Sequence, residues 1–231
     1  MRAPAQLPLP FTPDPRFAAV DFRDAPSNEA ARAWLDRTAD WPAHRLVLWG
    51  EAGCGKTHLL HIWAQRTGAE LRAGPSLRGL PELPAARGIA IDEADAVEDE
   101  TALLHLLNAA GEARLPVLLA ARGPPSRWTI RLPDLASRLR AITAVEIGPP
   151  EDDLLRALLA RLLADRQLRL TETVQDWLLL RLPRTAAALG DAVARLDAAA
   201  LEAHREITVP LAREVLGELA AAQPDEISGT A

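Results

Sequence analysis

Apolar and polar residues are arranged along this chain in two different patterns. Short, continuous apolar runs, typical of strands buried on both faces of a sheet, occur at residues 45–49, 88–92, 116–121 and 144–147. Segments with apolar residues at helical spacing, or with a helix-starting signal, occur at residues 29–36, 57–66, 103–107 and 134–140. We therefore predict an α/β fold in which helices cover both faces of a parallel sheet, with a Pro- and Gly-rich loop at residues 73–88.

The pattern changes at Gly148-Pro149-Pro150, after which every predicted element is a helix. Leucines at helical spacing predict one amphipathic helix at residues 154–163. Three further helices are expected at residues 173–182, 185–204 and 209–219. We predict a domain boundary near residue 149. The chain then divides into an extended, proline-rich tail (1–16), an α/β core (17–149) and a small all-helical lid domain (150–231).

The composition fits a globular protein without a membrane span. The 231 residues are 48% hydrophobic and 25% charged, and no apolar run approaches the roughly 18 to 20 residues that a span needs. The first residues lack the apolar segment of a secretion signal, and the single cysteine, Cys54, allows no intrachain disulfide, so we expect a cytoplasmic protein. The formal net charge of −6 argues against a general polyanion-binding surface.

A phosphate-binding loop is the strongest motif. The pattern G-x-x-x-x-G-K-T, between a predicted strand and a predicted helix, is matched by Gly50, Glu51, Ala52, Gly53, Cys54, Gly55, Lys56 and Thr57. Glycines let backbone N–H groups converge on phosphate oxygens, and the helix that follows adds partial positive charge. Lys56 is the one lysine among 26 basic residues, and we expect it to reach the β- and γ-phosphates while the Thr57 hydroxyl ligates Mg²⁺.

Acidic residues follow the second predicted strand. Asp92 ends that strand, where its carboxylate can hold Mg²⁺, and Glu93 is positioned to orient an attacking water. Residues 92–95 also spell the tetrapeptide of a helicase family, but those helicases need two tandem cores, which we do not expect in 231 residues. A solvated acidic loop is the alternative for Glu93 and Asp95, because three more acidic residues follow at 98–100.

The phosphate loop, the Asp92-Glu93 strand end and the helical lid together resemble the AAA+ ATPases over about residues 17–220. Five segments resemble one branch of this family, that of the bacterial replication initiator DnaA: residues 17–28, 48–50, 57–61, 122–125 and 133–139. The last segment looks most like the Hda group of regulators within that branch. This resemblance implies that Phe22 and Asn28 lie near the adenine base and that His58 belongs to the nucleotide-binding site. It also implies ADP or ATP, with Mg²⁺, as the bound cofactors.

The same resemblance assigns roles to two arginines. In this family the arginine of Ser-Arg-Leu acts on nucleotide held by a neighbouring subunit; here it is Arg138, which joins Glu93 as an expected catalytic group. Arg184 matches the lid arginine that senses the phosphate bound by its own subunit. The alternatives are a surface salt bridge for Arg138 and a helix cap or solvated side chain for Arg184, and Arg140 could reach the partner's phosphate in place of Arg138.

Two positions depart from the family pattern. Alanines and Arg122 stand after the third predicted strand, where the family often has a polar sensor residue. Arg140-Ala141 replaces the glycine that commonly follows the trans-acting arginine. Both departures predict inefficient self-hydrolysis, and they fit a protein that binds nucleotide for its shape and helps a partner hydrolyse its own.

The tail contains a segment that resembles the short peptide by which bacterial proteins dock on the DNA polymerase sliding clamp. Its expected contacts are an amide and three apolar anchors, supplied by Gln6, Leu7, Leu9 and Phe11. The two prolines between them pre-extend the segment and so lower the entropy lost on binding. A proline-rich tail with incidental leucines is the alternative.

Taken together, these features predict a nucleotide-bound negative regulator of replication initiation. It would dock on the DNA-loaded clamp and stimulate ATP hydrolysis by the DnaA initiator, contacting DNA through the clamp, with a homodimer or higher oligomer also open. The initiator's N-terminal oligomerisation domain and C-terminal DNA-binding domain are not expected here. The alternatives are a clamp-tethered adaptor or loader that recruits another replication factor, and a stand-alone P-loop nucleotide hydrolase.

Overall fold

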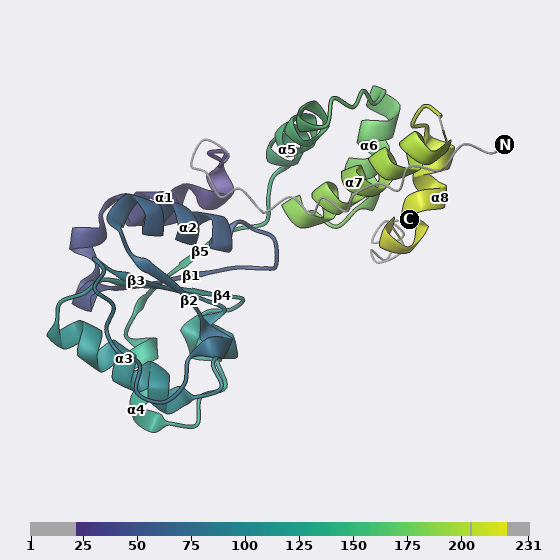
Figure 1. Ribbon diagram of the computed structural model, residues 1–231. Helices are drawn as coiled ribbons and strands as arrows, with labels where there is room; N and C mark the ends of the chain where they lie inside the picture. Colours follow the sequence, from purple (N-terminus) through teal and green to yellow (C-terminus); the bar gives the residue numbers. More distant parts are fainter. Residues whose placement is uncertain (1–21, 204, 221–231) are drawn as a thin grey trace, which may run out of the picture.

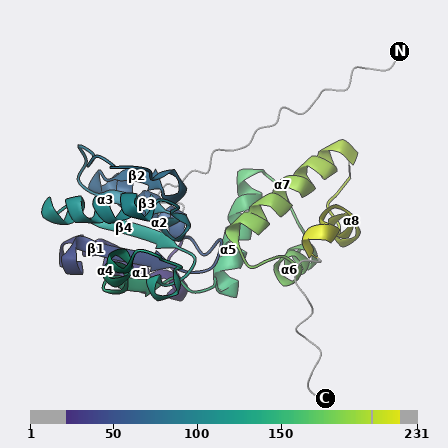
Figure 2. The ribbon, with the colours of Figure 1, turned by 90° about the horizontal axis from the view of Figure 1, so that it is seen from below.

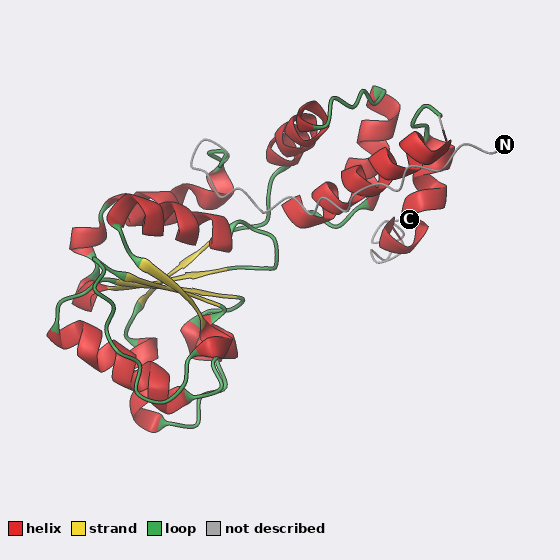
Figure 3. Ribbon diagram, in the orientation of Figure 1, coloured by secondary structure: helices red, strands yellow, loops and turns green. Residues whose placement is uncertain are grey.

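The computed structural model describes residues 22–203 and 205–220, which form an α/β core joined to a helical lid (Figure 1). Five parallel strands form one sheet in the order β2-β3-β4-β1-β5. Their bounds are β1 (Arg45–Trp49), β2 (Glu70–Ala73), β3 (Ile89–Asp92), β4 (Val117–Ala121) and β5 (Thr143–Glu146), and Figure 3 shows them between helical layers. Because all strands are parallel, the loops that follow β1, β3 and β4 lie at the same edge of the sheet.

Helices cover both faces of the sheet, which confirms the predicted fold class. α1 (Pro26–Asp36) and α2 (Lys56–Thr67) lie on one face, and α3 (Glu100–Glu112) and α4 (Pro133–Arg140) lie on the other (Figure 1). Short 3-10 segments connect these elements at Thr38–Asp40, Pro42–His44, Gly74–Ser76, Ala94–Ala96 and Pro125–Arg127. In β1, Val47 packs toward α3 and α4, whereas Leu46 and Leu48 pack toward α1 and α2. This double coverage explains why the strand reads as a continuous apolar run.

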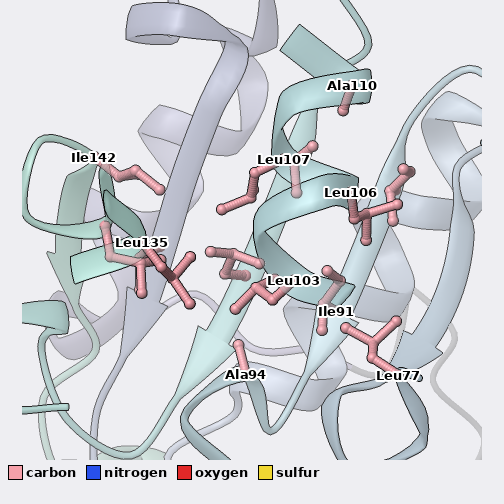
Figure 4. Close-up of a cluster of buried hydrophobic side chains, with 14 of the residues drawn as sticks. Leu77, Ile91, Ala94, Leu103, Leu106, Leu107, Ala110, Leu135 and Ile142 are labelled. Atoms are coloured by element: carbon pink, nitrogen blue, oxygen red, sulfur yellow. The ribbon is translucent and has the colours of Figure 1, made fainter. Parts of the chain in front are cut away.

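Leucines of α3 and α4 fill the core on their face of the sheet (Figure 4). Leu103, Leu106 and Leu107 of α3 and Leu135 of α4 are fully buried and pack in one cluster with Ile91 of β3. Burying each such side chain contributes about 1.5–3 kcal/mol relative to leaving it exposed. This core therefore fixes α3 and α4 against the sheet and determines where the last turn of α4 lies.

The lid has a hydrophobic core of its own. It consists of α5 (Asp152–Asp165), α6 (Glu172–Arg181), α7 (Ala186–Ala203) and α8 (Val209–Ala220). Leu159, Leu178, Leu196 and Leu216, one from each helix, are fully buried together. Figure 2 shows the lid beside the core, with α5 nearer to the core than α8. Among the described residues, no helix is both long and apolar enough to cross a membrane.

One strand is missing from the sequence prediction. β2 forms the edge of the sheet and pairs with β3 alone, and Glu70, Leu71 and Ala73 are exposed on it. Its residues, Glu-Leu-Arg-Ala, alternate between polar and apolar types, but the alternation covers four residues only and is too short to distinguish a strand from a loop. The loop expected at residues 73–88 begins inside β2, and the expected boundary at residue 149 falls between β5 and α5.

Candidate nucleotide-binding site

The phosphate loop lies between the end of β1 and the start of α2 and is held from both sides. The N–H of Gly50 donates to the carbonyl of Ala121, the last residue of β4, at 3.3 Å. Gly53 (φ +79°) and Gly55 (φ +104°) adopt left-handed backbone conformations that favour glycine. A Cβ on Gly53 would lie 2.4 Å from the Cβ of Thr185 in the lid, so the loop and the lid are in direct contact here.

Lys56 begins α2 and turns its side chain back over the loop. Its Nζ donates to the carbonyls of Gly50 and Glu51, both at 2.7 Å, and lies 3.6 Å from the Sγ of Cys54. The first N–H groups of a helix have no partner within the helix, so the start of α2 offers further donors to an anion. Glu51 and Ala52 are exposed on the loop. The loop thus places an ammonium group and the first amides of α2 close together, a combination that suits an anion.

Thr57 and Asp92 meet beside the loop. The Thr57 hydroxyl donates to Asp92 Oδ2 at 2.7 Å, and Asp92 Oδ1 accepts the N–H of Glu93 at 2.9 Å. Hydroxyl and carboxylate oxygens are the ligands that Mg²⁺ prefers, usually one or two from the protein with the remainder from phosphate and water. The described residues contain no cluster of three or more His, Cys, Asp or Glu side chains that could hold a metal without such help. This donor set therefore fits Mg²⁺ bound together with phosphate.

The acidic segment after β3 does more than face solvent. Glu93 is exposed and has a left-handed backbone (φ 51°, ψ 43°), which is uncommon for a residue other than glycine. A Cβ on Gly74 would come 2.3 Å from the Glu93 carbonyl oxygen, so the two backbones approach closely. Asp95 Oδ2 accepts the N–H of Arg122 at 2.9 Å, and Asp95 thereby orders the chain as it leaves β4. Sequence reasoning did not identify this tie.

A small pocket opens beside the loop, on the side where the resemblance implies the adenine base. Residues from both domains line it: Phe22, Arg23, Asn28, Gly53, Cys54, Gly55, Pro150, Leu154, Leu158 and Ala186. The Phe22 ring contacts His58 edge-on, with ring centroids 5.2 Å apart. Asn28 is buried, and its amide donates to the carbonyl of Arg23 (3.0 Å) and accepts the N–H of Ala25 (3.3 Å). Asn28 thus fixes the backbone turn that follows Phe22.

The lid carries Arg184 next to the residue that touches the loop. One guanidinium nitrogen of Arg184, Nη2, donates to the carbonyl of Pro150 at 2.9 Å and pairs with Asp152 Oδ1 at 2.7 Å. Beside it, the Glu151 carboxylate accepts the N–H and the hydroxyl of Ser27 at 2.6 and 2.9 Å. Burial alone would raise the pKa of the Glu151 carboxyl, but hydrogen bonds from its own N–H and from Ser27, with the charge of Arg184, lower it. These contacts join the start of α1 to the start of the lid.

Arg138 lies near the amino-terminal ends of the strands, whereas the phosphate loop lies at their carboxyl-terminal ends. α4 follows β4 and runs back against the strand direction, so its last turn reaches the edge where the strands begin. Burial and then the charge of Arg138 lower the pKa of Arg45, the first residue of β1. The loop follows the last residue of β1, about 13 Å away along the strand. Arg138 pairs with Asp134 at 3.1 Å, and its side chain is 41% exposed.

The structure thus brings together most of the site residues that the sequence indicates, from the loop to Phe22, Asn28, His58 and Asp92, but leaves Arg138 apart from them. The clamp-binding residues Gln6, Leu7, Leu9 and Phe11 lie outside the described residues. Sequence reasoning did not find the lid contacts of Thr185, Asp152 and Glu151. They depend on how two domains meet, and no motif in the sequence marks them.

Comparisons with known proteins give a family match for the lid and a relative for most of the chain. A family model described as the Hda lid domain matches residues 151–216. A protein of Haemophilus influenzae described as uncharacterized is 30% identical over 228 residues, which cover 91% of this chain and 98% of that protein.

Solved structures share the fold. Domain III of the Thermotoga maritima replication initiation protein DnaA matches with a TM-score of 0.73 and 16% identity, over 90% of this chain and 99% of that one. DnaA from Aquifex aeolicus, bound to AMPPCP, matches with a TM-score of 0.66 and 16% identity, over 82% and 67%. A mutant of the T. maritima RuvB branch-migration motor matches with 0.63 and 20%, over 84% and 68%. At such identities these structures show a shared fold.

Proposed function

This chain belongs to the Hda and DnaA-like AAA+ proteins, and from that membership we propose that it is a cytoplasmic negative regulator of replication initiation. It binds ADP or ATP with Mg²⁺, docks on the DNA-loaded sliding clamp and stimulates ATP hydrolysis by the DnaA initiator, which is left in its inactive ADP form. The observation that carries the proposal is the separation of Arg138 from the phosphate loop across one parallel sheet.

Nucleotide binding is supported by the loop geometry. Lys56 and the first amides of α2 would hold the phosphates, with Phe22 beside the base and Arg184 on the lid side. Thr57 and Asp92 would hold Mg²⁺, which when bound neutralises charge on the phosphate oxygens. The AMPPCP bound by a DnaA structure of the same fold adds support.

The position of Arg138 favours action on a partner. Its guanidinium lies at the edge of the sheet remote from the protein's own phosphate loop, and it has only an exposed ion pair with Asp134 to give up. A guanidinium that meets the charge developing on a γ-phosphate can raise the hydrolysis rate about 10³ to 10⁵-fold. A neighbouring ATPase that presents its nucleotide to the last turn of α4 would receive this contribution.

Clamp docking rests on the sequence of the tail. Gln6 to Phe11 supply the amide and the apolar anchors of a clamp-binding peptide, and the clamp would bring the protein to DNA. The DnaA initiator and the clamp are therefore the proposed partners, with DNA contacted through the clamp.

The test measures ATP hydrolysis by purified DnaA in the presence of clamp loaded on DNA. We expect Arg138→Ala to reduce the stimulation by more than tenfold while nucleotide binding and clamp capture persist. Arg195→Ala is the matched control, because Arg195 forms an i,i+4 pair with Asp191 in the lid and is similarly exposed at 48%. Stimulation by Arg138→Ala at the wild-type rate would refute the proposal for Arg138, and Arg140→Ala tests the neighbouring arginine.

A second measurement separates the alternatives. Gln6→Ala should abolish capture on immobilised clamp and lower the stimulation while leaving nucleotide affinity unchanged. A stand-alone hydrolase would turn over ATP rapidly without partners and would be indifferent to Gln6→Ala. A clamp-tethered adaptor would keep clamp capture but leave DnaA turnover unchanged.

A further inference from the structure

Arg184 is held by the lid's own acidic residue at a position next to the phosphate loop. Its Nη2 donates a hydrogen bond to the Pro150 carbonyl at 2.9 Å and forms an ion pair with the Asp152 carboxylate at 2.7 Å. Both acceptors lie where α5 begins, so the guanidinium is anchored at the junction between the core and the lid. The adjacent acid, Glu151, is engaged by Ser27 through both of its oxygens. Asp152 is therefore the carboxylate that competes for Arg184.

The next residue, Thr185, brings this competition to the nucleotide site. A Cβ built on Gly53 would lie 2.4 Å from the Thr185 Cβ, which places the side chain of Thr185 against the phosphate loop. The Cα atoms of Arg184 and Thr185 are one residue apart, about 3.8 Å. The backbone of Arg184 is thus next to the residue that contacts the loop, whereas its guanidinium pairs with Asp152 and lines a pocket on the lid together with Arg156 and Asp176.

We propose that Asp152 acts as an internal competitor of phosphate for Arg184 and so sets how strongly the protein distinguishes a triphosphate from a diphosphate. This inference rests on the proposed nucleotide binding. The Arg184–Asp152 pair is exposed, with side chains 41% and 78% accessible, so a polyphosphate can displace it without breaking a buried ion pair. A third phosphate adds charge and acceptor oxygens, which compete for the guanidinium better than a diphosphate does.

The competition has a predictable size. An exposed ion pair stabilises its partners to an extent that corresponds to about a 1.4- to 5-fold change in an equilibrium constant. Removing the negative charge of Asp152 should therefore strengthen triphosphate binding by about 1.4- to 5-fold and diphosphate binding by less. Asn in place of Asp keeps the shape and polarity of the side chain at the first turn of α5, so the lid should fold as before.

The experiment measures dissociation constants for ADP and AMPPCP, each with Mg²⁺, by calorimetry on the full chain. Asp152→Asn should bind AMPPCP about 1.4- to 5-fold more tightly and should raise the ratio of AMPPCP to ADP affinity. Asp191→Asn is the matched control, because Asp191 forms an exposed pair with Arg195 on the lid at 2.9 Å and does not line the pocket that contains Asp152 and Arg184. This control should bind both nucleotides as the wild type does. In an Arg184→Ala background, Asp152→Asn should have no effect.

The outcomes separate this inference from the proposed function. Wild-type protein that binds neither nucleotide would overturn both. Wild-type binding with an unchanged affinity ratio in Asp152→Asn would overturn the competition alone. A gain that persists in the Arg184→Ala background, or that appears equally in Asp191→Asn, would show a general effect of lid charge and would also overturn it.

Discussion

Replacing Gly53 by alanine tests whether the lid rests on the phosphate loop. Two separate costs follow from the structure at this position. Gly53 has φ +79°, where a side chain is disfavoured, and its added Cβ would lie 2.4 Å from Cβ and 2.8 Å from Cγ2 of Thr185. Carbon atoms prefer separations of about 3.5–4.0 Å, so Thr185 would have to move by about 1 Å or more. Thr185 caps α7 by accepting the N–H of Ala188 at 3.1 Å, and its movement would disturb that helix start.

Gly79 allows the two costs to be measured separately. It has φ +64° but no heavy atom within 4 Å of an added Cβ, so Gly79→Ala carries the backbone cost alone. That cost is about 1–2 kcal/mol for a left-handed residue with a side chain. Forcing an extra methyl group into a packed contact adds about 1–3 kcal/mol. We therefore expect Gly53→Ala to lower the free energy of unfolding by about 2–5 kcal/mol and Gly79→Ala by about 1–2 kcal/mol.

The assay is urea unfolding of both variants, followed by the double variant Gly53→Ala, Thr185→Gly. Glycine at a helix N-cap costs only a few tenths of a kcal/mol, so Thr185→Gly removes the clashing methyl group with little other damage. The double variant should recover most of the excess cost of Gly53→Ala. Equal costs for Gly53→Ala and Gly79→Ala, or strict additivity in the double variant, would show that the lid does not rest on this loop.

Two further predictions concern the core. Leu106→Ala should lower the free energy of unfolding by about 2–5 kcal/mol in urea titrations, because Leu106 is fully buried between α3 and the sheet; an effect below 1 kcal/mol would contradict this packing. The N–H groups of Gly79 and Ala102 lower the pKa of Asp99, so its contribution to stability is present above the pKa of the unfolded chain and is lost as pH falls through the lower folded value. Asp99→Asn should therefore lose less stability than the wild type on acidification, and parallel acid profiles of the two proteins would refute this.

Most of the fold is encoded in local patterns. Buried parallel strands read as apolar runs because both faces meet helices, so Leu46 to Leu48 predicted β1 directly. The lid helices have leucine stripes that face a common core, and their spacing predicted the α5 helix within two residues at each end. β2 was not predicted because it is positioned by backbone hydrogen bonds to β3, which do not depend on the polarity of its side chains.

The site divides in the same way. The phosphate loop was predictable because backbone geometry and phosphate chemistry require glycines and a lysine at fixed spacing in one short segment. Thr185 contacts Gly53 and Glu151 contacts Ser27, and each pair is more than 100 positions apart in the sequence. Asp152 contacts Arg184 at the junction of the two domains. Patterns in a single sequence do not record such proximity. A solvated acidic loop was one of the alternatives for Asp95, which is exposed in the structure and also accepts the backbone N–H of Arg122.

The proposed function follows from what lies at the two ends of the parallel strands. At the edge where strands end, the loop, Ser27 and Glu151 connect the core to the lid, so a nucleotide bound there would contact both domains and influence how they sit together. At the end of β4, on the same side of the sheet, Ala120 and Ala121 are fully buried and their side chains offer no polar group to a nucleotide. At the other end of the strands, α4 presents Arg138 to solvent, and the length of the strands separates this guanidinium from the phosphate loop. A nucleotide at one end of the strands would fix the protein's own conformation, and the exposed Arg138 at the other end is available to a partner. This arrangement suits a protein that promotes hydrolysis on its partner.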